Sequence, residues 1–139
     1  MFKVILLPVD LSDRHGPALN AAIALAGQSG GEVILLHVIE VIPGLSMAEE
    51  KEFYRRLEKL ARSHLEKLSK VPQQHKVNCR GEILYGNRGP EILRLAVQTR
   101  ADLIVLTAPR LDPTNPAAGW ASLSYKVGML APCPVLLVK

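Results

Sequence analysis

Five short aliphatic runs alternate with four segments of helical pattern along the chain, and this alternation limits the fold more than any other feature. The runs contain few polar residues, as in KVILLPV near the start and EVILLHVI after it. Runs of this kind are typical of parallel strands that are buried on both faces. The predicted strands cover 3–9, 32–39, a stretch within 76–84, 102–106 and 134–138, and the predicted helices cover 14–28, 47–70, 90–99 and 119–130.

The order of these elements predicts an α/β fold, with a single five-stranded parallel sheet and helices on both faces. Consecutive parallel strands need a crossover, and right-handed crossovers place their helices over the sheet. In a sheet of order 3-2-1-4-5, the ligand crevice lies between the carboxyl ends of strands one and four, where the winding direction reverses. Asp10 and the loop that begins at Thr107 would face each other there.

Local signals suggest how the helices begin. Asp10 either caps the first helix or turn, or binds a ribose hydroxyl. Ser12 or Asp13 is expected at the N-cap of the first helix, and Pro90 at the first position of the third, where a missing N–H does no harm. The apolar side of the second helix is expected to consist of Phe53, Leu57, Leu60, His64 and Leu68.

Composition excludes several classes of protein. The 139 residues fit one domain, 1–139, and the 48% hydrophobic content is mostly aliphatic. The net charge of +4 does not predict a nucleic-acid partner, because acidic and basic residues interleave in the second helix. No run is long enough to span a membrane, and Cys79 and Cys133 lack the spacing of a metal or redox site. We therefore expect a soluble cytoplasmic protein that needs no membrane.

The histidines do not predict a metal or catalytic site. They are distributed over different elements without an i,i+4 pair. Ser12, His37 and Asp10 could be combined into a triad, but the chain lacks a G-x-S-x-G turn, and a histidine in mid-strand is poorly placed as a base. We predict no catalytic residues and no metal ligands.

Over its full length the sequence resembles the universal stress protein family. The matching pieces are VILLPVDLS, EVILLHVI, the turn from Gly86 to Glu91, ADLIVL, and Ser122 followed at a fixed distance by APCPVLLV. Each piece alone is a weak signal, whereas their order and spacing together are specific. The resemblance implies a Rossmann-like sheet of the adenine nucleotide alpha hydrolase type, in the order 3-2-1-4-5.

Family members that bind ATP carry a glycine-rich signature after the fourth strand, and this chain departs from it. Thr107, Arg110 and Ala121 occupy the three glycine positions, and only the final Ser122 is retained. Glycine allows backbone N–H groups to converge on a phosphate because it has no Cβ and adopts positive φ. We therefore expect no triphosphate cradle of the family type. Arg110 either meets a phosphate with its guanidinium or pairs with Asp112 and closes the crevice.

Other parts of the nucleotide site are retained by resemblance. Pro8, Asp10 and the backbone of Val38 match positions that hold adenine and ribose in ATP-binding members, and Leu106 and Leu123 flank them. Ser122 either caps the fourth helix or offers its hydroxyl to an anion at that helix end. Trp120 either plugs the crevice or contributes to an interface.

The last predicted strand, 134–138, leaves an apolar sheet edge that other chains could pair with. The resemblance implies a homodimer through this edge. Our first hypothesis is a non-enzymatic, dimeric universal stress protein that acts through an unknown protein partner, with a degenerate nucleotide site and no cofactor. The alternative is a sensor that binds ATP or AMP, with slow hydrolysis at most. A small cofactor-binding or electron-transfer module is a third hypothesis.

Overall fold

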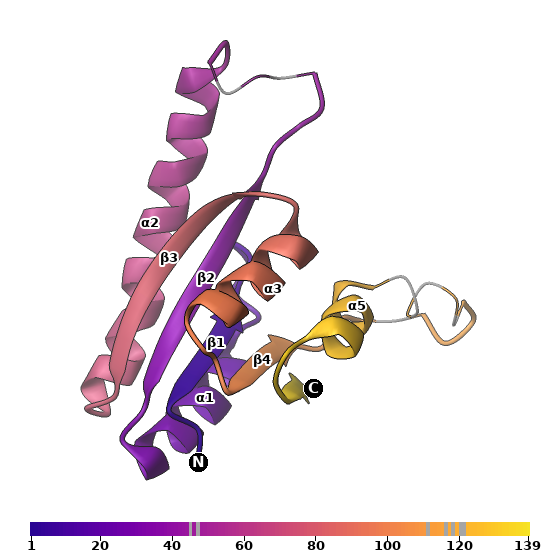
Figure 1. Cartoon of the computed structure of the whole chain (residues 1–139). Helices are drawn as coiled ribbons and strands as arrows, with labels where there is room; N and C mark the ends of the chain where they lie inside the picture. The colour runs from indigo at the N-terminus through magenta and orange to yellow at the C-terminus, as the bar shows by residue number, and fades with distance from the viewer. Residues whose placement is uncertain (45, 47, 111, 116, 118, 120–121) are drawn as a thin grey trace.

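The computed structural model describes residues 1–44, 46, 48–110, 112–115, 117, 119 and 122–139. Its centre is one five-stranded parallel sheet in the order β3-β2-β1-β4-β5 (Figure 1). The predicted topology is confirmed. The strands are β1 (Val4–Pro8), β2 (Glu32–Glu40), β3 (Asn78–Gly86), β4 (Leu103–Thr107) and β5 (Val135–Val138).

Helices cover both faces of this sheet. The described helices are α1 (Gly16–Ser29), α2 (Lys51–Gln74), α3 (Arg88–Gln98) and α5 (Leu123–Leu130). Successive residues of β1 enter opposite cores, since Ile5 and Leu7 pack with α1 and α2 while Leu6 packs with α3 and α5. The continuous aliphatic runs are thus explained by a strand that is buried on both faces.

Asp102 joins the beginnings of β1 and β4. Its two carboxylate oxygens accept hydrogen bonds from the backbone N–H groups of Lys3 and Val4, at 2.8 and 3.0 Å. Its own N–H donates to the carbonyl of Val4 at 3.0 Å. One side chain therefore fixes the register between two strands that lie far apart in the sequence.

The predicted starts of α1 and α3 are wrong, as are those of the two other helices described below. α1 begins at Gly16 with His15 at its N-cap, because Ser12 is held in a turn by Asp10 and is not available to cap the helix. α3 begins at Arg88, so Pro90 is its third residue and not its first. The third position also lacks an intrahelical acceptor for its N–H, so proline is tolerated there as well.

The second helix begins and ends four residues later than predicted, and its buried side is rotated. The buried residues are Tyr54, Ala61, Leu65 and Pro72. Phe53 and Leu60 are exposed. The small Ala61 lies against the sheet, and a Cβ at Gly81 of β3 would lie only 3.2 Å from Leu65. The third strand ends at Gly86, two residues beyond the end of the predicted stretch.

The last described helix, α5, begins at Leu123 and not at 119 as predicted, and Ser122 is its N-cap. Among the residues that the structure describes, no helix combines the length and the apolar character needed to cross a bilayer. The longest, α2, carries charged residues along most of its length.

Gly31 marks a close approach of two backbones at the start of β2. A Cβ there would lie 2.6 Å from the carbonyl oxygen of Phe2 and 2.8 Å from that of Lys3. We expect Gly31→Ala to lower the free energy of unfolding by ~1–3 kcal/mol, as overpacking does elsewhere. Urea denaturation measures this change.

The matched control is Gly128→Ala, because a Cβ on this exposed residue of α5 meets no atom within 4 Å. This variant should be as stable as the wild type or gain up to ~1 kcal/mol from helix propensity. Equal stability of the Gly31 and Gly128 variants would contradict the close approach.

Candidate functional site

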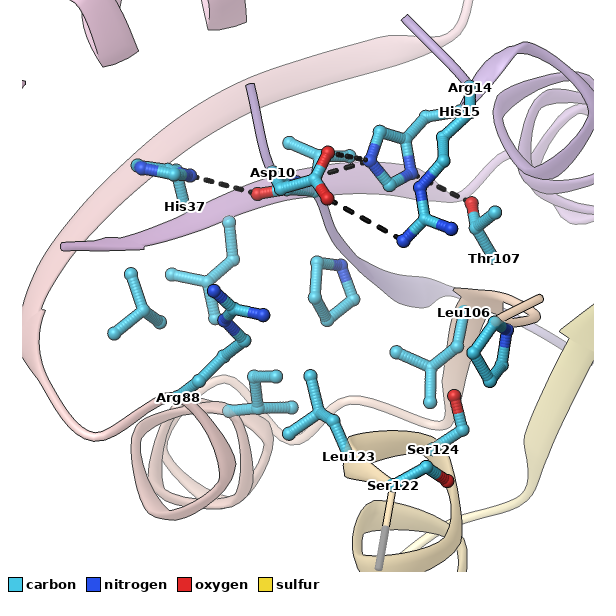
Figure 2. A pocket seen from close by; sticks show the side chains of 16 residues that line it. Asp10, Arg14, His15, His37, Arg88, Leu106, Thr107, Ser122, Leu123 and Ser124 are labelled. Atoms are coloured by element: carbon cyan, nitrogen blue, oxygen red, sulfur yellow. Dashed lines mark hydrogen bonds and ion pairs between the residues drawn. The ribbon is translucent and has the colours of Figure 1, made fainter. Parts of the chain in front are cut away.

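A cavity of about 180 Å³ lies where β1 and β4 separate at the carboxyl end of the sheet (Figure 2). Its walls come from the ends of β1, β2 and β4 and from the starts of α1, α3 and α5. The lining combines apolar side chains with charged and hydroxyl groups. The lining residues are Pro8, Val9, Asp10, Arg14, His15, Leu36, His37, Val38, Arg88, Ile92, Leu106, Thr107, Pro109, Ser122, Leu123 and Ser124.

Asp10 is the first acidic residue after β1, and its two carboxylate oxygens have different surroundings. Oδ1 accepts hydrogen bonds from Ser12 N at 2.9 Å, from the Ser12 hydroxyl, and from His15 Nε2 at 2.7 Å. Oδ2 lies 3.6 Å from the guanidinium of Arg14 and the side chain is 36% exposed. The turn role that we predicted is present, and Oδ2 remains open toward the cavity.

His15 connects Asp10 to the end of β4. The second ring nitrogen, Nδ1, lies 2.7 Å from Thr107 Oγ1, and the side chain is only 5% exposed. Among the buried residues that the structure describes, His15 is the only one with a polar side chain apart from Tyr54, whose hydroxyl accepts a hydrogen bond from Ile42 N. Figure 2 shows the three residues in a row along one wall.

The protonation of Asp10 follows from these contacts. Partial burial disfavours the charged carboxylate, but the hydrogen bonds from Ser12 and His15 outweigh it and hold the pKa of Asp10 far below its usual range. Asp10 is therefore ionised at neutral pH. This charge holds the turn between β1 and α1 together.

Two arginines flank the cavity from opposite sides (Figure 2). Arg14 faces Asp10, as described above, and the Arg88 guanidinium lies 3.6 Å from Glu40 at the end of β2. Both guanidiniums are about half exposed, so they can turn toward an anion at little cost. Neither arginine was predicted as a site residue from the sequence.

The structure brings together most of the predicted site residues. Those that line the cavity are Pro8, Asp10, Val38, Leu106, Thr107, Ser122 and Leu123. Arg110 lies instead on a second cavity of about 310 Å³. Ala121 and Trp120 lie outside the described residues. The roles of these residues in binding stay predictions.

The contacts bear on two of the alternatives and on His37. Ser122 caps α5, because its hydroxyl accepts a hydrogen bond from Tyr125 N at 3.2 Å. The Asp112 carboxylate accepts hydrogen bonds from Thr114 N and Oγ1 at 2.9 and 2.7 Å, and its partner is thus a turn residue and not Arg110. His37 Nδ1 lies 2.9 Å from the carbonyl of Val9, so this ring nitrogen has a partner within the fold.

Comparison with known proteins gives a single family. A family model described as the universal stress protein family matches residues 1–139. The chain is 35% identical over 144 residues to the "universal stress protein in QAH/OAS sulfhydrylase 3′ region" of Thermus aquaticus, with all of both chains covered. The solved structure of UspA from Lactobacillus plantarum is similar with a TM-score of 0.81 and 25% identity, and covers 99% of this chain and 98% of that one.

A more distant solved structure shares the fold. The universal stress protein family protein from Arabidopsis thaliana, solved with AMP bound, has a TM-score of 0.73 and 17% identity. The match covers 99% of this chain and 91% of that one. At this identity the similarity shows the fold alone.

The lowered pKa of Asp10 predicts a pH-dependent contribution to stability. A carboxylate whose pKa is lower in the folded chain than in the unfolded chain stabilises the fold. This contribution is complete above the unfolded-state pKa of about 3.9, and it is lost as the pH falls toward the folded-state pKa. Asp10→Asn should lower the free energy of unfolding by ~1 kcal/mol at pH 7, less than the pKa shift alone would suggest, because the carboxylate is partly exposed.

Urea denaturation at pH 7 and pH 3 checks this expectation. The difference between wild type and Asp10→Asn should narrow at pH 3. Asp13→Asn, an exposed residue of the same turn, is the matched control and should change little at either pH. A difference that stays constant between the two pH values would contradict the role of the Asp10 charge.

Proposed function

Because this chain belongs to the universal stress protein family, we propose that it is a non-enzymatic stress-response module that binds an adenine mononucleotide and does not bind ATP in the family manner. It acts through contacts with a partner protein, and the nucleotide regulates those contacts. The observation that carries this proposal is the cavity at the strand ends, where an apolar slot adjoins the open Oδ2 of Asp10.

The apolar side of the cavity fits an adenine ring. Val38, Leu106 and Leu123 contribute aliphatic side chains, and Pro8 adds the end of β1. A flat base loses water-exposed surface between such side chains, which favours binding. The backbone of Val38 offers polar groups for the edge of the base, as the family resemblance implies.

Asp10 is placed to bind the ribose. Its Oδ1 is used within the turn, but Oδ2 has only the distant contact with Arg14. A ribose hydroxyl that donates to Oδ2 would form a charge-assisted hydrogen bond without breaking the turn. Acidic residues bind ribose in this way at the corresponding edge of many doubly wound sheets.

The surroundings of Thr107 disfavour a triphosphate. Its side chain occupies the place where the family has glycine, and its hydroxyl is engaged with His15. Pro109 has no N–H to donate, and the Ser122 hydroxyl already caps α5. Arg14 and Arg88 supply positive charge for one phosphate group. The AMP in the Arabidopsis thaliana relative supports a mononucleotide in this fold.

Isothermal titration calorimetry tests this proposal. AMP should bind at micromolar affinity, and ATP should bind no more tightly. Asp10→Ala should weaken AMP by about 10-fold, the loss of one charge-assisted hydrogen bond. Asp13→Ala should leave the affinity unchanged. Combined Thr107→Gly, Arg110→Gly and Ala121→Gly should strengthen ATP, because glycine restores room for phosphates.

Two results would overturn the proposal. One is the absence of heat from both AMP and adenosine at millimolar concentration. The other is the release of stoichiometric ATP, identified by mass spectrometry, when the purified wild-type protein is unfolded.

The exposed edge of β5 supports the further proposal of a homodimer. β5 pairs with β4, and no described residue pairs with its other edge. Leu136 and Leu137 are 38% and 41% exposed, and Met129 and Leu130 of α5 are 67% and 68% exposed. An edge of this kind is a template for pairing with a second strand, and apolar side chains beside it gain from being covered.

Light scattering tests the homodimer. The wild type should have the mass of a dimer at micromolar concentration, and Leu136→Lys should shift it to a monomer, because a buried unpaired charge at an interface is costly. The control is Leu60→Lys on α2, which changes a leucine that is 58% exposed and lies away from this edge. A wild-type monomer, or equal dissociation by both variants, would contradict the proposal.

A further inference from the structure

Asp10, His15 and Thr107 form a connected row of carboxylate, imidazole and hydroxyl. The contacts Asp10 Oδ1 to His15 Nε2 and His15 Nδ1 to Thr107 Oγ1 are both 2.7 Å. A hydroxyl becomes a nucleophile when a base lies within hydrogen-bond reach and a third group orients that base. From the sequence, Ser12, His37 and Asp10 were considered for these roles. In the structure Asp10 contacts Ser12 within the turn, but the imidazole that it contacts is that of His15 and not of His37.

The direction of the hydrogen bonds suits the removal of a proton from Thr107. Asp10 is ionised and can only accept, so His15 donates through Nε2 to Oδ1. In the neutral ring, Nδ1 then carries the lone pair and accepts the Thr107 O–H. The Asp10 N–H lies farther from Nε2, at 3.2 Å, than the carboxylate does. The burial of His15 keeps water from competing for either ring nitrogen.

Thr107 is accessible although His15 is not. It lines both the first cavity and the second one of about 310 Å³. Among the described residues that line the second cavity, three have basic side chains and none is Asp or Glu. The residues are Arg14, Pro17, Ala18, Thr107, Ala108, Pro109, Arg110, Val138 and Lys139. A compound with an anionic leaving group would therefore place that group beside Arg14 and Arg110 when its electrophilic carbon meets Thr107.

We propose that Thr107 is a self-acylation site that accepts an acyl group from an acyl phosphate. Thr107 Oγ1 attacks the carbonyl carbon, and the new Oγ1–C bond forms as the C–O bond to phosphate breaks. The hydroxyl proton passes to His15 Nδ1 and then to the departing phosphate. The products are a threonine ester and hydrogen phosphate, so no other reactant is needed. The step modifies each chain once, and it goes beyond the nucleotide binding proposed above.

The experiment is incubation of the full-length protein with acetyl phosphate, without nucleotide, followed by intact mass and peptide mapping. One acetyl group per chain should appear on Thr107. Thr107→Ser should retain the modification and Thr107→Val should abolish it. Thr99→Val is the matched control, because the Thr99 hydroxyl donates to the carbonyl of Leu95 and lies outside both cavities.

His15→Gln should slow acetylation by about 100-fold, the usual contribution of a general base. His75→Gln, at the C-cap of α2 and outside both cavities, should not change the rate. Asp10 acts as a positioning residue. Asp10→Asn should lower the maximal rate of labelling while the half-saturating concentration of acetyl phosphate stays the same.

Three outcomes would overturn this proposal, and each can be measured on the wild type if the variants fail to fold. They are a label on lysine or on Cys79 or Cys133 with Thr107 unmodified, a phosphoryl group in place of the acetyl group, and no modification at all. Because AMP is absent from the assay, failure here leaves the calorimetric test of the proposed function unaffected.

Discussion

β1 is the element on which the rest of the structure depends, because it is enclosed on all sides. It is hydrogen-bonded to β2 on one edge and to β4 on the other, and helices cover both of its faces. Ile5, Leu6 and Leu7 are completely buried. No polar side chain can be accommodated until the strand leaves the sheet. Asp10, the first polar residue after β1, therefore lies where the chain emerges from the core and where the two halves of the sheet separate.

The sheet could be predicted from the sequence because its signal is local. Each buried strand is a run of aliphatic residues, and the order of elements restricts the topology to very few possibilities. The starts of the helices were less predictable, since capping residues compete for partners. Ser12 is a residue type that commonly caps helices, but its N–H and its hydroxyl donate to the Asp10 carboxylate instead. The orientation of α2 depends on two small residues, Ala61 of the helix and Gly81 of β3. The spacing of apolar residues within one helix does not reveal a contact with another element.

Many residues that line the candidate site were predictable, but His15 and the contacts among the polar residues were not. Leu106 and Leu123 follow from the position of the strand ends and from the family resemblance. His15 was missed because its partner Thr107 lies 92 residues away, and no spacing rule connects them. The loss of glycine at position 107 was interpreted only as a loss of space for phosphate. The structure shows that it also introduces a hydroxyl, which meets the buried imidazole.

The contact between Asp102 and the N–H groups of Lys3 and Val4 has a consequence for the order of folding. The strand at the centre of the sheet is made first, but its neighbour β4 and the carboxylate that sets their register follow about a hundred residues later. Until then, one edge of β1 has no partner. During synthesis the half formed by β1, β2, α2 and β3 must persist with an open, strongly apolar edge, and this interval is when the nascent chain is most exposed to aggregation.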